Sequence, residues 1–202
     1  MALIGKVGAI YIADGTSTTF TDEATTSNDA TYKIYYITNR AKRYWDDSYP
    51  ITVKKNGTTI TTGFTIHHAG GYIIFDTANS GSDVITVSGK YYTPTQCATF
   101  FNWKVDIEQD LKEVTTFTSN GWKEQIVATN GWSASAEGYW ADGTFFSRLG
   151  SRFIVSLYVD STTNKVYEGY TVIKKCSVDT PCDDVVKESI DFEGTGILVY
   201  HG

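Results

Sequence analysis

Two pairs of carboxylates have a spacing that could support catalysis. Glu108 and Asp110, and later Asp191 and Glu193, stand two residues apart in segments that alternate between apolar and polar residues. On one face of a strand this spacing is roughly 6.5–7 Å, which a pair of glycosidase carboxylates could use. No neighbouring group forms a pocket that would raise the pKa of one partner, and acidic strand faces are far more often solvated. We therefore expect no enzyme activity.

Other catalytic and metal-binding motifs are absent from the sequence. It has no Gly-x-Ser-x-Gly elbow, phosphate loop, His-Glu-x-x-His or Cys-x-x-Cys. His67 and His68 could be combined with Asp76 as metal ligands, but adjacent residues of a strand point to opposite faces. The third histidine, His201, is next to last, where chains usually fray. We expect neither a metal nor a cofactor.

The three cysteines, Cys97, Cys176 and Cys182, match neither a zinc site nor a disulfide scaffold. We expect reduced, partly buried thiols.

The composition predicts a folded, mainly β protein. The 202 residues are 41% hydrophobic and 14% aromatic, which is enough apolar surface for a core. Helical patterns are nearly absent, while Thr, Tyr and Gly are abundant. No apolar run approaches the roughly 20 residues of a membrane helix, and the first residues lack a signal peptide's pattern. The net charge of −6 argues against a surface that grips nucleic acid.

The carboxylate pairs lie in two predicted strands. In residues 103–111, one face carries Trp103, Val105, Ile107 and Leu111. The other face carries Lys104, Asp106, Glu108 and Asp110. In residues 189–194, the apolar Ile190 and Phe192 alternate with Asp191 and Glu193. Each strand thus turns apolar side chains to a core and carboxylates to an open face, which is either a solvated sheet face or the acidic wall of a water-filled passage.

The charge distribution divides the chain. Residues 31–92 carry seven Lys and Arg against four Asp and Glu, whereas residues 93–202 carry nine against fifteen. The middle segment is typical of short hairpins, with Asn56-Gly57 as a type I′ turn. We predict a small β-sandwich domain at 28–92, inserted into a β domain formed by 1–27 and 93–202. One short helix is predicted at 143–149, capped by Asp142 and ended by Gly150.

Several short motifs, taken in order, resemble the major tail tube proteins of long-tailed, non-contractile bacteriophages. They are residues 1–12 (MALIGKVGAIYI), 120–124 (NGWKE), 131–140 (GWSASAEGYW), 167–170 (YEGY) and 189–196 (SIDFEGTG). Residues 37–46 (ITNRAKRYWD) are similar to an accessory β module near the front of some such proteins. The tube-like similarity covers residues 1–27 and 93–202.

The resemblance implies a β-sandwich or barrel with one short flanking helix, whose copies form hexameric or pseudo-hexameric rings stacked into a tube for DNA ejection. Its implied partners are further copies of itself, the tape measure, tail terminator and baseplate proteins, and DNA in transient passage. It implies location in the virion tail, and in the host cytoplasm during assembly. Acidic residues lining the lumen would repel the phosphate backbone of DNA.

Within this interpretation, two sets of residues are candidates for function. The lumen-facing candidates are Asp106, Glu108, Asp110, Asp191 and Glu193. The candidate loop to a neighbouring ring contains Thr115, Thr116, Thr118 and Gly121. The basic 28–92 domain is expected on the exterior of the tube.

Three alternatives remain open from the sequence. A tail terminator or baseplate-proximal tube protein would form a single ring. A module that binds cell-surface glycans would stay monomeric and show exposed aromatic residues in one groove. A polysaccharide-cleaving enzyme would need its carboxylate pair in a cleft.

Overall fold

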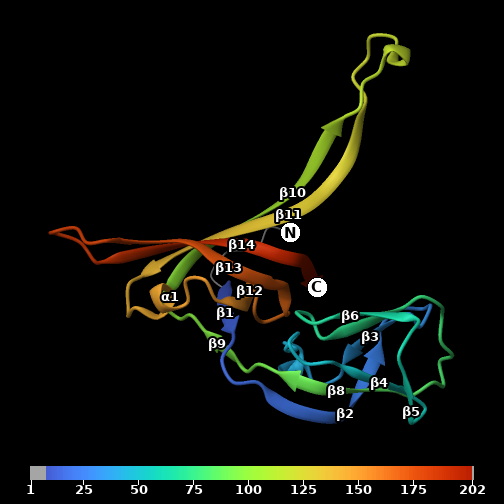
Figure 1. Cartoon of the computed structure of the whole chain (residues 1–202). Helices are drawn as coiled ribbons and strands as arrows, with labels where there is room; N and C mark the ends of the chain where they lie inside the picture. Colours follow the sequence, from blue (N-terminus) through green and yellow to red (C-terminus); the bar gives the residue numbers. More distant parts are fainter. Residues whose placement is uncertain (1–7, 202) are drawn as a thin grey trace. The chain divides into compact units, whose positions relative to one another are not determined.

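The structure is a computed structural model that describes residues 8–201 (Figure 1). Its described part consists of long and short strands, two 3-10 turns and one α-helix, α1 (Thr144–Ser147), which confirms the predicted fold class. Most of the opening tail-tube-like motif, residues 1–7, lies outside the described residues. The chain divides into two compact units. Unit 1 comprises the chain up to Cys97 together with Phe153–Gly169 and the residues from Val199 on, and unit 2 comprises Ala98–Arg152 and Tyr170–Leu198.

Unit 1 contains a seven-stranded antiparallel sheet with the order β5-β4-β8-β2-β3-β7-β6. Its strands are β2 (Thr18–Ser27), β3 (Ile34–Ile37), β4 (Thr52–Lys55), β5 (Thr58–Ile60), β6 (Phe64–His67), β7 (Tyr72–Phe75) and β8 (Ile85–Tyr91). The sheet folds over one apolar core, in which Val53 and Val87 from one half meet Tyr35 and Ile73 from the other. Trp45 lies fully buried within this core. The arrangement is the small sandwich expected for a chain of hairpins.

The hairpin between β4 and β5 turns where the sequence predicted. Asn56 and Gly57 have φ angles of 51° and 81°, the left-handed values that a type I′ turn requires. Asn56 also fixes the neighbouring loop, because its side-chain oxygen accepts a hydrogen bond from the backbone N–H of Val84 at 2.8 Å.

Strand β2 belongs to this sheet although its residues precede the boundary predicted at 27/28. It pairs with β8 and, through its second half, with β3. The register shift between Phe20 and Glu23 marks an irregularity in the strand, and such bulges bend a strand between two partners. The assignment of 28–92 to a separate domain stays a prediction.

The other sheet has the order β10-β11-β14-β13-β12-β1-β9. Its strands are β1 (Ala9–Ala13), β9 (Pro94–Gln96), β10 (Phe100–Glu113), β11 (Gln125–Tyr139), β12 (Arg152–Asp160), β13 (Lys165–Asp179) and β14 (Lys187–His201). Both β13 and β14 contribute residues to each unit. In unit 1, β1 pairs with β9 and β12, and in unit 2, β11 pairs with β10 and β14. Among residues 8–201, no helix has the length and apolar character needed to span a membrane.

The structure corrects some local predictions. The helix is shorter than the predicted 143–149, although the Asp142 carboxylate does accept a hydrogen bond from the backbone N–H of Thr144 at 2.8 Å. Cys97 and Cys176 are half-buried as expected, but Cys182 is exposed because it lies in the loop after β13. His201 does not fray. It ends β14 and is buried at 6% exposure.

Candidate functional site: the acidic face and hairpin arm of unit 2

Strand register in unit 2 brings the carboxylates of two distant segments onto one sheet face. Asp106 on β10 lies opposite Ser133 on β11, and Ser133 in turn lies opposite Glu193 on β14. Along the neighbouring row, Lys104, Ser135 and Asp191 are aligned in the same way. Residues directly opposite one another in a sheet point to the same side. We call the carboxylates of Asp106, Glu108, Asp191 and Glu193 the acidic face.

Two lysines partly neutralise the acidic face. Lys104 Nζ lies 2.8 Å from the Asp106 carboxylate, and Lys174 Nζ lies 2.9 Å from that of Glu193. The pKa of Lys174 is raised, first by its hydrogen bond and charge interaction with Glu193 and then by Asp191 and Glu108. Four carboxylates against two ammonium groups leave an excess of two negative charges on this face of each copy.

Asp110 lies farther along β10, at an irregularity in the pairing. The register with β11 shifts between Gln109 and Leu111. Thr129 on β11 donates a hydrogen bond to the Asp110 carboxylate at 3.1 Å. Asp110 therefore stands farther out than the other four lumen candidates, although Glu108, opposite Gly131, also lies beyond the last pairing of β11 with β14.

The opposite side of the same strands is apolar and close-packed. Ala134, Ala136, Ile190 and Phe192 are buried there. The Trp132 indole crosses Gly194 and donates a hydrogen bond to the Gly196 carbonyl at 3.0 Å. A Cβ at position 194 would lie 2.3 Å from the indole ring, so only glycine fits. This confirms the predicted alternation of Ile190 and Phe192 with the two carboxylates.

Beyond this packed part, β10 and β11 continue as a two-stranded arm. The pairing of β11 with β14 ends at Ser133, whereas its pairing with β10 extends to Gln125 (Figure 1). Of residues 107–131, which we call the hairpin arm, all but Ser119 are exposed. The predicted apolar face of β10 thus splits, because Trp103 and Val105 are half-buried while Ile107 and Leu111 are exposed.

The hairpin arm exposes many large apolar side chains that its own chain does not cover. Phe117 at the tip is fully exposed, and Trp122 is 79% exposed. The other large apolar side chains exposed along the arm are Ile107, Leu111, Val114, Ile126 and Val127. An open pocket of about 630 Å³ lies at the base of the arm, with Ile107, Trp132 and Ile197 in its lining. Large exposed apolar residues gathered on one element in this way mark interaction surfaces.

The tip of the arm is an ordered turn that contains all four predicted loop residues. Thr116 begins the 3-10 turn η3 (Phe117–Ser119), and its hydroxyl lies 2.8 Å from that of Thr118. Thr115 Oγ accepts a hydrogen bond from the backbone N–H of Glu124 at 3.1 Å. Gly121 has a φ of 80°, which closes the turn in the left-handed region. The loop therefore presents Phe117 on a defined backbone.

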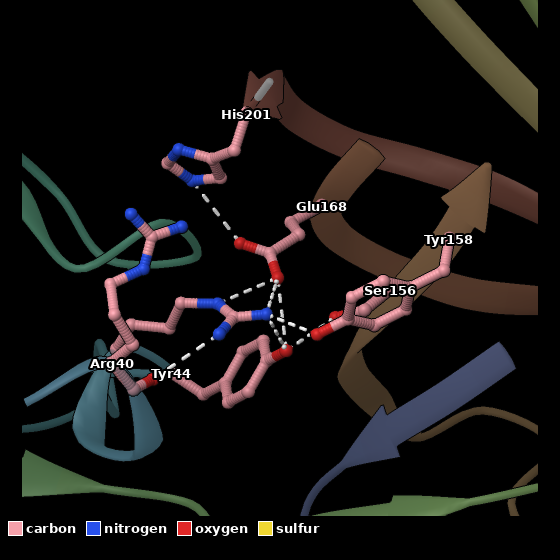
Figure 2. Close-up of polar contacts among 7 residues, drawn as sticks. Arg40, Tyr44, Ser156, Tyr158, Glu168 and His201 are labelled. Carbon is pink, nitrogen blue, oxygen red and sulfur yellow. Dashed lines mark hydrogen bonds and ion pairs between the residues drawn. The ribbon is translucent and has the colours of Figure 1, made fainter. Parts of the chain in front are cut away.

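Unit 1 holds a buried polar cluster that the sequence did not predict (Figure 2). The Glu168 carboxylate on β13 is fully buried and accepts hydrogen bonds from Arg43 Nε at 2.8 Å and the Tyr44 hydroxyl at 2.9 Å. Its other oxygen lies 3.2 Å from His201 Nε2. Ser156 on β12 completes the cluster through the Tyr44 hydroxyl at 3.0 Å. The cluster joins the segment after β3 to strands β12, β13 and β14 within unit 1.

The charges of this cluster stabilise one another. Burial alone would raise the pKa of Glu168, but the close contact with His201 and the charge and hydrogen bonds of Arg43 outweigh it, so the pKa is lowered. Burial and the Glu168 charge raise the pKa of the Tyr44 hydroxyl. Arg43 and Glu168 are 125 residues apart in the sequence. The only sequence signal for them is that they lie in the motifs 37–46 and 167–170.

Comparison with known proteins identifies the family. Residues 78–200 match the family model described as phage tail tube protein. The match spans more than half of the chain, from the loop before β8 through nearly all of β14. The chain belongs to the phage tail tube protein family.

This finding confirms the resemblance, the structural function and the virion tail location expected from the motifs. Solved structures similar to part of the tail tube protein include two particle structures. One is the tail of an empty GTA particle, computed with helical refinement and C6 symmetry, with a TM-score of 0.46, 14% identity and coverage of 55% of this chain and 87% of that chain. The other is the virion of a native gene transfer agent particle, with a TM-score of 0.45, 14% identity and coverage of 54% and 88%. No curated protein matches the sequence.

The structure treats the candidate histidines differently from the lumen and loop candidates. His67 and His68 are not brought into a metal site, since residues 8–201 contain no group of three or more His, Cys, Asp or Glu that could hold a metal ion. His67 instead stacks on the Tyr72 ring, with centroids 4.4 Å apart. Four of the five lumen candidates of the tail tube protein lie on the acidic face, and Asp110 lies farther along the arm. The loop candidates lie at the arm tip, and all these roles stay predictions.

Proposed function

We propose that this tail tube protein forms rings of six or pseudo-six copies that stack into a hollow tube, and that each hairpin arm packs against a copy in a neighbouring ring. The observation that carries the proposal is the arm itself. An isolated two-stranded hairpin is at best marginally stable in water, and this one also exposes seven large apolar side chains. Packing against another copy supplies the cover that its own chain lacks.

The acidic face is our proposed lumen wall. Its excess of negative charge would repel phosphate groups, so DNA would slide through without adsorbing. The lysines at Asp106 and Glu193 limit this repulsion without reversing it. Asp110 would lie nearer the ring junction than the acidic face, because it is farther along the arm than Glu108. The basic segment 28–92 would then face outward, away from the DNA.

The remaining roles follow from the tube. The tape measure would occupy the lumen during assembly, and the terminator and baseplate proteins would bind the two end rings. The role is structural, with no catalytic step. Head-to-tail contacts that close by rotation give rings, and contacts along the axis give filaments.

Negative-stain electron microscopy of the concentrated protein tests this proposal, with size analysis in parallel. Hollow filaments with a regular axial repeat are the expected result. Single rings that never stack would favour a terminator or baseplate-proximal role. Particles that stay monomeric at every concentration, even when seeded with preformed tail ends, would contradict the proposal and favour the glycan-binding module.

A further inference from the structure

A second candidate site lies in unit 1, beside the buried cluster. It is an open pocket of about 410 Å³, within the size range of small-molecule sites. Its lining includes Asn28, Tyr36, Arg40, Asn164, Tyr200 and His201. These residues come from the loop directly after β2, from β3, from the 3-10 turn η2 (Arg40–Lys42), from the β12–β13 turn and from β14.

Arg40 supplies the pocket with a free positive charge. Its guanidinium makes no hydrogen bond or ion pair with any residue that the structure describes, in contrast to Arg43, which is fully engaged by Glu168. The Arg40 backbone is nevertheless held, because its carbonyl accepts a hydrogen bond from Arg43 Nη1 at 3.3 Å. Figure 2 shows the Arg40 guanidinium on the His201 side of the cluster. A planar fork of donors in this position suits a carboxylate.

Aromatic rings and amides surround this charge. The Tyr36 ring packs edge-on against His201, with centroids 5.6 Å apart. The Tyr200 ring is 52% exposed and rests on Tyr167 at 4.9 Å. Such rings offer an apolar face with a polar tip, and the amides of Asn28 and Asn164 offer both donors and acceptors. This combination matches the hydroxyl groups and C–H faces of a sugar ring.

The negative charges near the pocket are already engaged. Glu168 behind His201 is paired with Arg43. Asp160 beneath the β12–β13 turn accepts hydrogen bonds from the backbone N–H and hydroxyl of Thr162, at 2.9 and 2.6 Å. The charge left open to a ligand is therefore that of Arg40, and the pocket favours an anion over a cation or a neutral compound.

We propose that this pocket binds a carboxylated sugar, in which Arg40 engages the carboxylate while Tyr36 and Tyr200 pack against the ring. The site belongs to unit 1 and does not depend on tube assembly. It would give the particle a weak, many-copy affinity for acidic saccharide surfaces, since each copy of the chain carries one pocket.

Saturation-transfer NMR with D-glucuronate tests this proposal on the full chain, whether monomeric or assembled. We expect saturable binding, at least about tenfold tighter than for D-glucose, the uncharged counterpart. Arg40→Gln should weaken glucuronate binding by about tenfold or more, because a charge-assisted contact is lost. Tyr200→Leu should also weaken binding. Lys175→Gln, which removes an exposed charge outside the pocket, should not.

Three results would overturn the assignment. One is the absence of saturable glucuronate binding. Another is unchanged binding in both Arg40→Gln and Tyr200→Leu, with folding verified by circular dichroism. The third is displacement of glucuronate by equimolar inorganic phosphate, which would reduce the pocket to a general anion site.

Discussion

Replacing Phe117 and Trp122 together by serine should prevent tube formation while leaving the subunit folded. Both side chains lie on the hairpin arm, one fully exposed and the other 79% exposed. Because neither is buried within its own chain, their loss should change the free energy of unfolding by no more than about 0.5 kcal/mol each. The subunit should therefore melt at nearly the wild-type temperature.

The effect on assembly follows from the surface that a neighbouring copy would cover. Burying a large apolar side chain contributes about 1.5–3 kcal/mol, so the double substitution removes about 3–6 kcal/mol from each arm contact. A loss of about 3 kcal/mol already weakens the affinity of each arm contact by roughly a hundredfold. Since every copy in a ring would contribute one arm, the lost free energies of all the arms add up at each ring junction.

Pelleting over a concentration series, with electron microscopy of each fraction, measures this effect as the critical concentration for filaments. Phe146→Ser is the matched control, because Phe146 on α1 is 72% exposed but lies outside the arm. The reasoning is refuted if the double variant forms filaments at the wild-type critical concentration.

Three further predictions concern packing, pH and DNA. Gly194→Ala should destabilise the fold by about 1–3 kcal/mol in denaturant titration, because its Cβ would collide with the Trp132 ring, whereas Gly131→Ala, with open space around it, should be nearly neutral. Glu168→Gln should cost about 3–5 kcal/mol at neutral pH by leaving its buried cation unpaired. The lowered pKa of Glu168 means that its contribution is complete above its ordinary value of 4.5 and is lost as pH falls through the lower folded-state pKa. The free energy of unfolding of the variant should therefore depend less on pH in the acid range than that of the wild type. An equal pH dependence in the two proteins would contradict this. Neutralising the acidic face with amides should raise DNA retention by tubes at least about tenfold at low salt and less at high salt, while Asp183→Asn in the exposed loop after β13 should not.

The parts of the fold that sequence predicted well are governed by local rules. The Asn56-Gly57 turn requires left-handed backbone at both positions, and these residues tolerate it. Ile190 and Phe192 alternate with carboxylates along β14, and both apolar side chains are buried. In both cases the short-range pattern contains all the information that the structure uses.

The buried cluster could not be predicted in the same way. Arg43 and Glu168 are 125 residues apart in the sequence and meet only in the folded chain. In the sequence, each of them looks like an ordinary charged surface residue. His201 was expected to fray by its position near the end, but its pairing within β14 and its contact with Glu168 bury it. Cys182 was expected to be partly buried, and its exposure reflects a loop whose packing the sequence does not encode locally.

The apolar alternation of strand β10 is correctly predicted, but only part of it is buried within its own chain. Its apolar residues keep a period of two from Trp103 to Ile107, yet the cover from its own chain fades after Val105. A strand that needed apolar residues only for its own core would become polar at that point, as solvent-exposed hairpins do. We therefore attribute the exposed apolar face formed by Leu111 and the opposite Val127 to the contact with a second copy that we propose. The acidic face lies at the base of this arm. Asp106, Asp191 and Glu193 stand in rows where β10, β11 and β14 run side by side, whereas Glu108 stands opposite Gly131, beyond the last pairing with β14. The lumen wall that we propose would need a continuous sheet at the three-stranded rows.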